Sequence, residues 1–176
     1  MQRKLIVITG SSGVGKSTLA QTLQEELLPE HWLHVSVDTI FYCLPRSVVL
    51  RVDHENDSSM VDSKAIVTSA YACARTLLDL AHKVIFDAVI LTEKGAQDML
   101  RAFDGFDPLL VELTCSWEEI EKRTLARGDR TLAEAEHGYR NACGRLGAHH
   151  TFDSTRASAE QIAAQLATIM RVGSAA

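Results

Sequence analysis

The sequence predicts an α/β fold with a mostly parallel five-stranded sheet and helices on both faces. Short apolar runs alternate with segments of helical periodicity along the chain, and the first apolar run is continuous. A continuous run is typical of a strand that is covered on both faces, as in parallel sheets. With 176 residues, of which 46% are hydrophobic and 23% charged, the chain has the length and composition of a globular domain. We therefore expect a single domain over residues 1–176.

The five strands are predicted from short stretches of five or six residues. The first is "KLIVIT" at residues 4–9, which is rich in β-branched side chains. The others are "LHVSVD", which ends at Asp38, "KVIFD", which ends at Asp87, "LLVELT" at residues 109–114 and "HHTFD" at residues 149–153.

Helices are predicted between these strands. Residues 16–28 carry leucines at intervals of four, and Pro29 follows them as a stop. Ser116 with Glu119, and Ser158 with Gln161, have the spacing of capping boxes that open helices. The predicted helices are residues 16–28, 63–82, 93–103, 117–127 and 131–143, with a last one opening at Ser158, whereas residues 39–62 are expected to be irregular apart from a short helix.

The stretch "GSSGVGKST" lies between the first strand and the first helix, and it fits the pattern G-x-x-x-x-G-K-[ST]. Glycines allow such a loop to turn successive N–H groups toward phosphate oxygens, and the following helix adds its positive end. Lys16 is expected to reach the β- and γ-phosphates, and the Ser17 hydroxyl to bind Mg²⁺. A glycine-rich turn that binds nothing is disfavoured by this strand–helix context. The predicted phosphate-binding residues are Gly10, Ser11, Ser12, Gly13, Val14, Gly15, Lys16, Ser17 and Thr18.

Two aspartates end predicted strands, and such ends lie at the edge of a parallel sheet where ligands bind. Asp87 follows "KVIF" and resembles the acidic residue that holds Mg²⁺ in phosphate-loop proteins. Asp38 stands where a base acting on a substrate hydroxyl could lie. The alternative for both is a helix N-cap, a position that aspartate fills well.

The segment "RTLARGDR" gathers three arginines near a predicted helix end at Gly128. Arg123 and Arg127 are four residues apart, so they project from the same helix face, and Arg130 follows the glycine. Guanidinium groups match phosphate oxygens and can offset the charge that develops during phosphoryl transfer. We interpret the segment as a mobile lid over a nucleotide rather than as a solvated helix end.

The bulk composition argues against some classes of partner. The net charge is −5, without the basic face that a nucleic-acid-binding protein usually has. The apolar run behind Arg3 and Lys4 is too short for a signal-peptide core or a membrane span. The four cysteines show no metal-ligand spacing, which favours reduced thiols. We expect a cytoplasmic protein that contacts neither nucleic acid nor membrane, and its oligomeric state stays open.

The sequence resembles the chloramphenicol phosphotransferase family of small P-loop kinases. The resemblance is carried by "GSSGVGKST", "VSVDTIFYCLP", "KVIFDAVIL", "LTCSWEEIEKRTLARGDR" and "FDST". It implies a three-layer P-loop kinase fold with a lid at about residues 123–140, and the use of ATP and Mg²⁺. The implied reaction moves the γ-phosphate to a hydroxyl of a small molecule, chloramphenicol or a related antibiotic among the candidates.

The resemblance also implies roles for individual residues. Asp38 corresponds to the base, and Arg127 and Arg130 correspond to lid arginines, with Arg123 beside them. Ala88 departs from the family pattern, in which a second acidic residue follows the one at the end of the third strand. Residues 42–63, which would line the acceptor pocket, show no match to the family.

Two alternative functions stay open at this point. The first is a kinase of another small metabolite, such as a nucleoside, a sugar or a nucleotide-sugar. The second is an ATP-binding regulator that is not a kinase. A GTPase is disfavoured, because no Asn-Lys-x-Asp motif for guanine follows a later strand.

Overall fold

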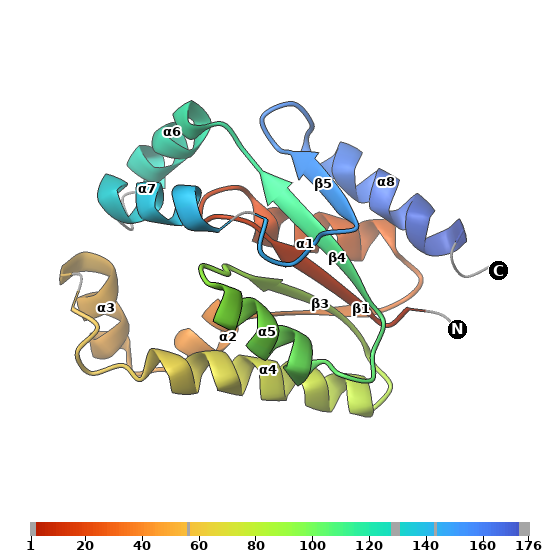
Figure 1. Cartoon of the computed structure of the whole chain (residues 1–176), viewed down its shortest axis with the longest axis horizontal. Helices are drawn as coiled ribbons and strands as arrows, with labels where there is room; N and C mark the ends of the chain where they lie inside the picture. The colour runs from red at the N-terminus through yellow and green to blue at the C-terminus, as the bar shows by residue number, and fades with distance from the viewer. Residues whose placement is uncertain (1–2, 56, 128–130, 143, 173–176) are drawn as a thin grey trace.

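The computed structural model describes residues 3–55, 57–127, 131–142 and 144–172 (Figure 1). In this part of the chain five strands form one sheet, in the order β2-β3-β1-β4-β5. The strands are β1 (Leu5–Thr9), β2 (Trp32–Ser36), β3 (Lys83–Ala88), β4 (Pro108–Thr114) and β5 (His150–Asp153). The helices are α1 (Lys16–Glu26), α2 (Val37–Phe41), α3 (Arg46–Glu55), α4 (Ser63–Asp79), α5 (Glu93–Ala102), α6 (Trp117–Arg127), α7 (Leu132–Asn141) and α8 (Ala159–Val172).

The neighbouring strands all pair in parallel, so their carboxyl ends meet at one edge of the sheet. In Figure 1, α1 and α8 cover one face of the sheet, and α4 and α5 cover the other. The predicted class of fold, a parallel five-stranded sheet between two helical layers, is confirmed. Among the described residues, we find no helix with the length and apolar character that crossing a bilayer requires.

Each face of the sheet has its own apolar core. Alternate residues of β1 point to opposite faces, so Ile6 and Ile8 join the core beneath α1 and α8, and Leu5 and Val7 join the core beneath α4 and α5. The second core contains a cluster of aromatic rings in which Phe86 contacts both Tyr71 and Phe103. Burial, with a smaller contribution from the charge of Asp98, raises the pKa of Tyr71 to about 12. These two cores fix the sheet on which the candidate site is built.

The second strand differs from the sequence prediction at its end. We expected it to run to Asp38, but β2 ends at Ser36, and Asp38 lies in the first turn of α2. The cause is local: the Ser36 hydroxyl accepts a hydrogen bond from the Thr39 amide, and the Thr39 hydroxyl accepts one from the Ser36 amide. This reciprocal capping box starts a helix before the strand can continue. Asp38 is therefore neither a strand end nor an N-cap.

The region between Asp38 and the long helix α4 is also more helical than expected. Besides α2 it contains α3, which begins directly after Pro45. The amides of Val48 and Val49 both donate to the Pro45 carbonyl, so this proline begins the helix with its backbone already in a compatible conformation. No residue of α3 is buried. The helix lies near the carboxyl edge of the sheet, opposite α7 (Figure 1).

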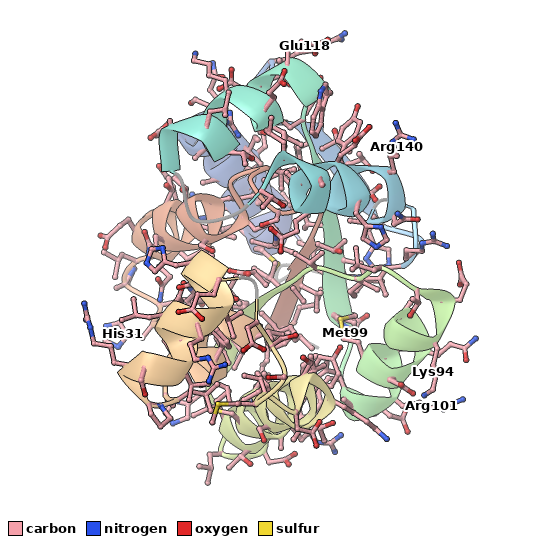
Figure 2. The ribbon with its side chains drawn as sticks, turned by 90° about the vertical axis from the view of Figure 1, so that its left-hand side faces the viewer. His31, Lys94, Met99, Arg101, Glu118 and Arg140 are labelled. Carbon is pink, nitrogen blue, oxygen red and sulfur yellow. The ribbon has the colours of Figure 1, made fainter. Side chains whose placement is uncertain are left out.

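Helices α6 and α7 also lie beside the carboxyl edge of the sheet (Figure 1). Ile120 of α6 and Ala135 of α7 are buried in the core beneath α1, and Trp117 and Tyr139 pack against that core with their rings in contact. The other side of this helix pair carries charged residues. Figure 2, which looks onto this edge, shows Glu118 and Arg140 pointing away from the protein.

Candidate active site

The loop between β1 and α1 has the backbone geometry that the sequence motif requires. Gly10 has φ +147°, and a Cβ atom at this position would lie 2.2 Å from the Leu113 carbonyl oxygen of β4. Gly15 caps α1 in the left-handed region at φ +97°. Both conformations are accessible to glycine and strained for other residues. The glycines therefore let the loop pass close to β4 and turn into α1.

Lys16 is the first residue of α1 and is almost fully buried, at 8% exposure. Its Nζ donates to the Ser11 carbonyl oxygen at 3.0 Å. The Lys16 side chain therefore folds back over the phosphate loop that precedes α1. The ammonium group and the N-terminal end of α1 are thus both directed toward the loop. A positive charge and a helix N-terminus beside a glycine-rich loop are suited to binding phosphate oxygens.

Ser17 and Asp87 meet at the carboxyl edge although they are 70 residues apart in the chain. The Ser17 Oγ donates to the Asp87 Oδ2 at 3.1 Å. Asp87 is 4% exposed and lies beside Ile8 of β1 in the sheet register. His34 of β2 also contacts the Oδ2 atom of Asp87, through Nε2 at 2.6 Å. A hydroxyl and a carboxylate next to a phosphate loop are the oxygen donors that Mg²⁺ prefers, so these residues fit that ion.

No cluster of three or more His, Cys, Asp or Glu side chains suited to a metal occurs within the described ranges.

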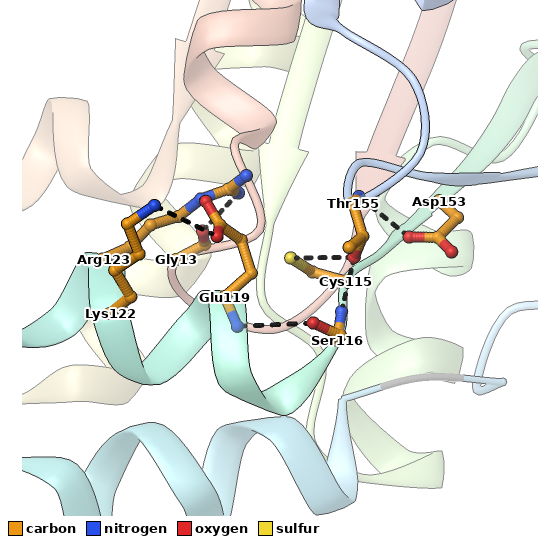
Figure 3. Close-up of polar contacts among 8 residues, drawn as sticks. All are labelled: Gly13, Cys115, Ser116, Glu119, Lys122, Arg123, Asp153 and Thr155. Atoms are coloured by element: carbon orange, nitrogen blue, oxygen red, sulfur yellow. Dashed lines mark hydrogen bonds and ion pairs between the residues drawn. The ribbon is translucent and has the colours of Figure 1, made fainter.

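Arg123 connects α6 to the phosphate loop (Figure 3). Its Nη1 donates to the Gly13 carbonyl oxygen at 3.1 Å, and its Nε donates to the Glu119 Oε1 at 3.0 Å. Glu119 is itself placed by Ser116, whose hydroxyl accepts a hydrogen bond from the Glu119 amide. The helix cap predicted from the sequence thus helps to position a guanidinium group next to the loop.

A cavity of about 790 Å³ lies at the carboxyl edge and joins these residues. It brings together Lys16, Ser17, Asp38, Asp87 and Arg123, which lie on α1, α2, β3 and α6. Its remaining lining residues are Ser12, Gly13, Val14, Gly15, Thr18, Leu19, Val37, Val67, Ala88, Val89, Leu113, Ala126, Ser154, Ala157, Ser158, Ala159 and Ile162. Gly10 and Ser11 belong to the same loop but are not among the residues that line this cavity.

Two of the predicted lid arginines are not placed in the site. Arg127 is the last residue of α6, and only its backbone is described. Arg130 lies outside the described residues. The lid expected at about residues 123–140 thus includes the end of α6 and most of α7.

Some site residues are not apparent from the sequence. The loop between β5 and α8 lines the cavity with Ser154, Ala157 and Ser158; the sequence marked "FDST" and the helix cap at Ser158, but neither signal predicted a place in the site. It is tied to the start of α6, because the Ser116 amide donates to the Thr155 hydroxyl at 2.7 Å (Figure 3). Hydrogen bonds from Thr155, chiefly from its amide, lower the pKa of Asp153. His34 was also missed, because a single histidine within a strand carries no motif.

The sheet order, the phosphate loop and the acidic residue at the end of β3 define a P-loop kinase fold. Solved structures of other proteins have the same fold. A Chloroflexus aurantiacus protein provisionally described as a kinase superposes with a TM-score of 0.68 at 23% identity, covering 98% of this chain and 99% of that one. Shikimate kinase from Acinetobacter baumannii has a TM-score of 0.64 at 16% identity, covering 97% and 94%.

The chain belongs to the family of chloramphenicol phosphotransferase-like proteins, which matches residues 3–171. A Mycobacterium tuberculosis H37Rv protein provisionally named as an O-phosphotransferase is 32% identical over 145 residues, or 72% of this chain. The chain covers 64% of the length of that relative. The resemblance to this family found in the sequence is confirmed.

Proposed function

We propose that the protein transfers the γ-phosphate of ATP to a hydroxyl group of a small molecule. One observation carries the proposal: Asp38 lines the same cavity as Lys16 and Ser17 of the phosphate loop. A phosphate donor and a carboxylate that can accept a proton would therefore share one cavity. Phosphoryl transfer depends mainly on positioning and on charge stabilisation, and this arrangement can supply both.

The phosphate loop would hold the donor nucleotide. The loop amides and Lys16 bind and orient the β- and γ-phosphates, and Arg123 adds positive charge from α6. Ser17 and Asp87 would hold Mg²⁺, which, when bound, neutralises phosphate charge. The lid segment at about residues 123–140, with Arg127 and Arg130, would close over the nucleotide and exclude water from the γ-phosphate.

Asp38 would act on the acceptor. It is exposed toward solvent rather than packed in the core, and it lies at the start of α2 beside the cavity. Its carboxylate accepts the proton of the acceptor hydroxyl, and the hydroxyl oxygen then forms a bond to the γ-phosphorus as the bond to ADP breaks. The proton stays on the carboxylate until the product leaves. A positioned general base of this kind contributes about 10²- to 10⁴-fold to a rate.

The Asp38→Asn variant tests this assignment. We expect phosphate transfer to fall by about 10²-fold or more, because the amide cannot accept the proton. ATP affinity should stay within about twofold, since the phosphate loop is unchanged. Transfer is followed with γ-labelled ATP, and ATP binding by titration calorimetry.

Asp104→Asn is the matched control. Asp104 is exposed and precedes β4, at the opposite edge of the sheet from the cavity, so its substitution should leave transfer unchanged. Equal transfer rates in the Asp38→Asn variant and the native protein would remove Asp38 from the role of base.

The acceptor is proposed at the level of its chemistry, a small molecule with a free hydroxyl. Membership of the family favours chloramphenicol or a related antibiotic as the first acceptor to test. Nucleosides, sugars and nucleotide-sugars form the second panel, with cytoplasmic ATP as the donor. ATP hydrolysis that no acceptor stimulates would instead favour an ATP-binding regulator.

A further inference from the structure

The Asp87 carboxylate is held at one oxygen by side chains from two other elements. Ser17 of α1 reaches Oδ2 at 3.1 Å, and His34 of β2 reaches the same atom at 2.6 Å. The Asp87 side chain is 6% exposed and that of His34 is 17% exposed, so little water competes for either contact. A buried carboxylate needs such partners, because burial without them disfavours its charged form.

The register of the sheet explains why these residues meet. His34 pairs with Ile85 and Ser36 pairs with Asp87, so His34 and Asp87 are diagonal neighbours on one face of the sheet. This face also carries Ile6 and Ile8 beneath α1. Ser17, in the first turn of α1, approaches the carboxylate from the helical layer.

His34 touches Asp87 from behind the site. Ser17 and Asp87 line the cavity, whereas His34 is absent from the described residues of the lining. The imidazole therefore contacts the carboxylate without being among the residues that line the cavity. An ionised carboxylate can only accept hydrogen bonds, which assigns the proton of this contact to the Nε2 atom of His34.

We propose that His34 is a positioning residue, which holds the Asp87 carboxylate in the orientation that binds the divalent cation of a bound nucleotide. This inference rests on the proposed use of Mg²⁺ and ATP. A group that orients a metal ligand usually affects metal affinity by about 10- to 100-fold without touching the metal. The role requires the donor at Nε2, not the bulk of the ring.

Two substitutions of similar polarity separate these requirements. In His34→Gln the side-chain amide nitrogen lies close to the position of Nε2 and can still donate to Asp87. In His34→Asn the shorter side chain places its amide near the position of Nδ1, too far from Asp87 to replace the contact. Both variants keep a neutral polar group in β2, so a loss of folding would affect them alike.

The measurement is binding of a non-hydrolysable ATP analogue by titration calorimetry, with and without Mg²⁺. We expect His34→Asn to weaken Mg²⁺ binding in the analogue complex by about 10- to 100-fold. Analogue affinity without Mg²⁺ should be unchanged, because Lys16 and the loop are intact. His34→Gln should restore most of the Mg²⁺ affinity.

His31→Ala is the matched control, because His31 lies three residues earlier and points away from the protein (Figure 2). It should leave both affinities unchanged. In an Asp87→Asn background, His34→Asn should have no further effect on Mg²⁺ affinity, because the two residues act as one unit.

The outcomes separate this inference from the proposed function. Native Mg²⁺ affinity in His34→Asn, or equal losses in His34→Gln and His34→Asn, would overturn the positioning role and leave the phosphotransferase proposal standing. If the native protein binds the analogue with no dependence on Mg²⁺, the cation site fails, and with it both the role of His34 and the assignment of Ser17 and Asp87.

Discussion

Gly10 shows how one residue determines the approach of the phosphate loop to the sheet. Its φ of +147° is strained for other residues, and the Leu113 carbonyl oxygen occupies the space that a side chain would need. Gly105 is also left-handed, at φ +86°, but a Cβ atom there would meet nothing within 4 Å. A substitution at Gly105 would therefore introduce backbone strain alone, whereas one at Gly10 would add a steric clash.

We predict that Gly10→Ala destabilises the protein more than Gly105→Ala does. Gly105→Ala should cost about 1–2 kcal/mol in the free energy of unfolding, the usual cost of a left-handed non-glycine residue. Gly10→Ala adds a clash with backbone that cannot rotate away, so we expect a loss well above 2 kcal/mol, together with weaker ATP binding. Urea unfolding of both variants measures the difference. Equal losses would show that β4 moves to accept the methyl group.

Helix caps, rather than helix interiors, decide where several elements begin. The Ser36–Thr39 box ends β2 early and turns Asp38 toward the cavity. Thr131 forms a second box at the start of α7: its hydroxyl accepts a hydrogen bond from the Glu134 amide, and the Glu134 carboxylate accepts one from the Thr131 amide. Because α7 is part of the proposed lid, the hydrogen bonds of its N-cap contribute to the stability of that segment.

We predict that Thr131→Ala weakens α7. The loss of an N-cap hydroxyl should cost about 1 kcal/mol, and amide hydrogen exchange should accelerate in α7 before it does elsewhere. Thr168→Ala is the control: Thr168 lies within α8, is exposed and bonds to the Ala164 carbonyl, so alanine there should be neutral or slightly stabilising. Unchanged exchange in α7 would mean that packing of Ala135 and Tyr139 alone maintains this helix.

At the scale of the whole molecule, the parallel sheet gathers residues from distant parts of the sequence at one edge. Ser17 and Asp87 are joined there, and Arg123 contacts Gly13 across 110 residues. A nucleotide bound at this edge would contact both the phosphate loop and α6. Ligand binding to the native state alone should therefore stabilise the entire fold.

We predict that ATP with Mg²⁺ raises the Tm. At a concentration 100 times the Kd, binding adds about 2.7 kcal/mol to the free energy of unfolding. For a chain of this size that corresponds to a rise of roughly 5–10 °C in a thermal scan. Lys16→Met should lose most of the rise, and Lys94→Met, which replaces an exposed lysine on α5, should keep it. No shift in the native protein at saturating ATP would contradict nucleotide binding at the loop.

Much of the fold was predictable because its signals are local. The five strands and the helices α1, α4, α5, α6, α7 and α8 were expected from short apolar runs, helical periodicity and residues such as Pro29 and Ser158. The end of β2 was not predicted, because "SVDT" reads equally as a strand end and as a capping box. In the structure the capping box between Ser36 and Thr39 forms, so the chain begins α2 instead of extending β2. Within residues 39–62 only one short helix was expected, without bounds, whereas the structure has α3 there and α2 beginning just before.

By itself, the sequence determined the phosphate loop and the parallel sheet, since glycine positions and continuous apolar strands are consequences of local backbone geometry and burial. Only the tertiary structure decided that Asp38 enters the cavity from a helix, and that His34 and Ser17 converge on one oxygen of Asp87. Those contacts depend on the register between β2 and β3 and on the placement of α1. No short segment of the sequence encodes this register or the placement of α1, because both arise from the packing of elements that are distant in the chain.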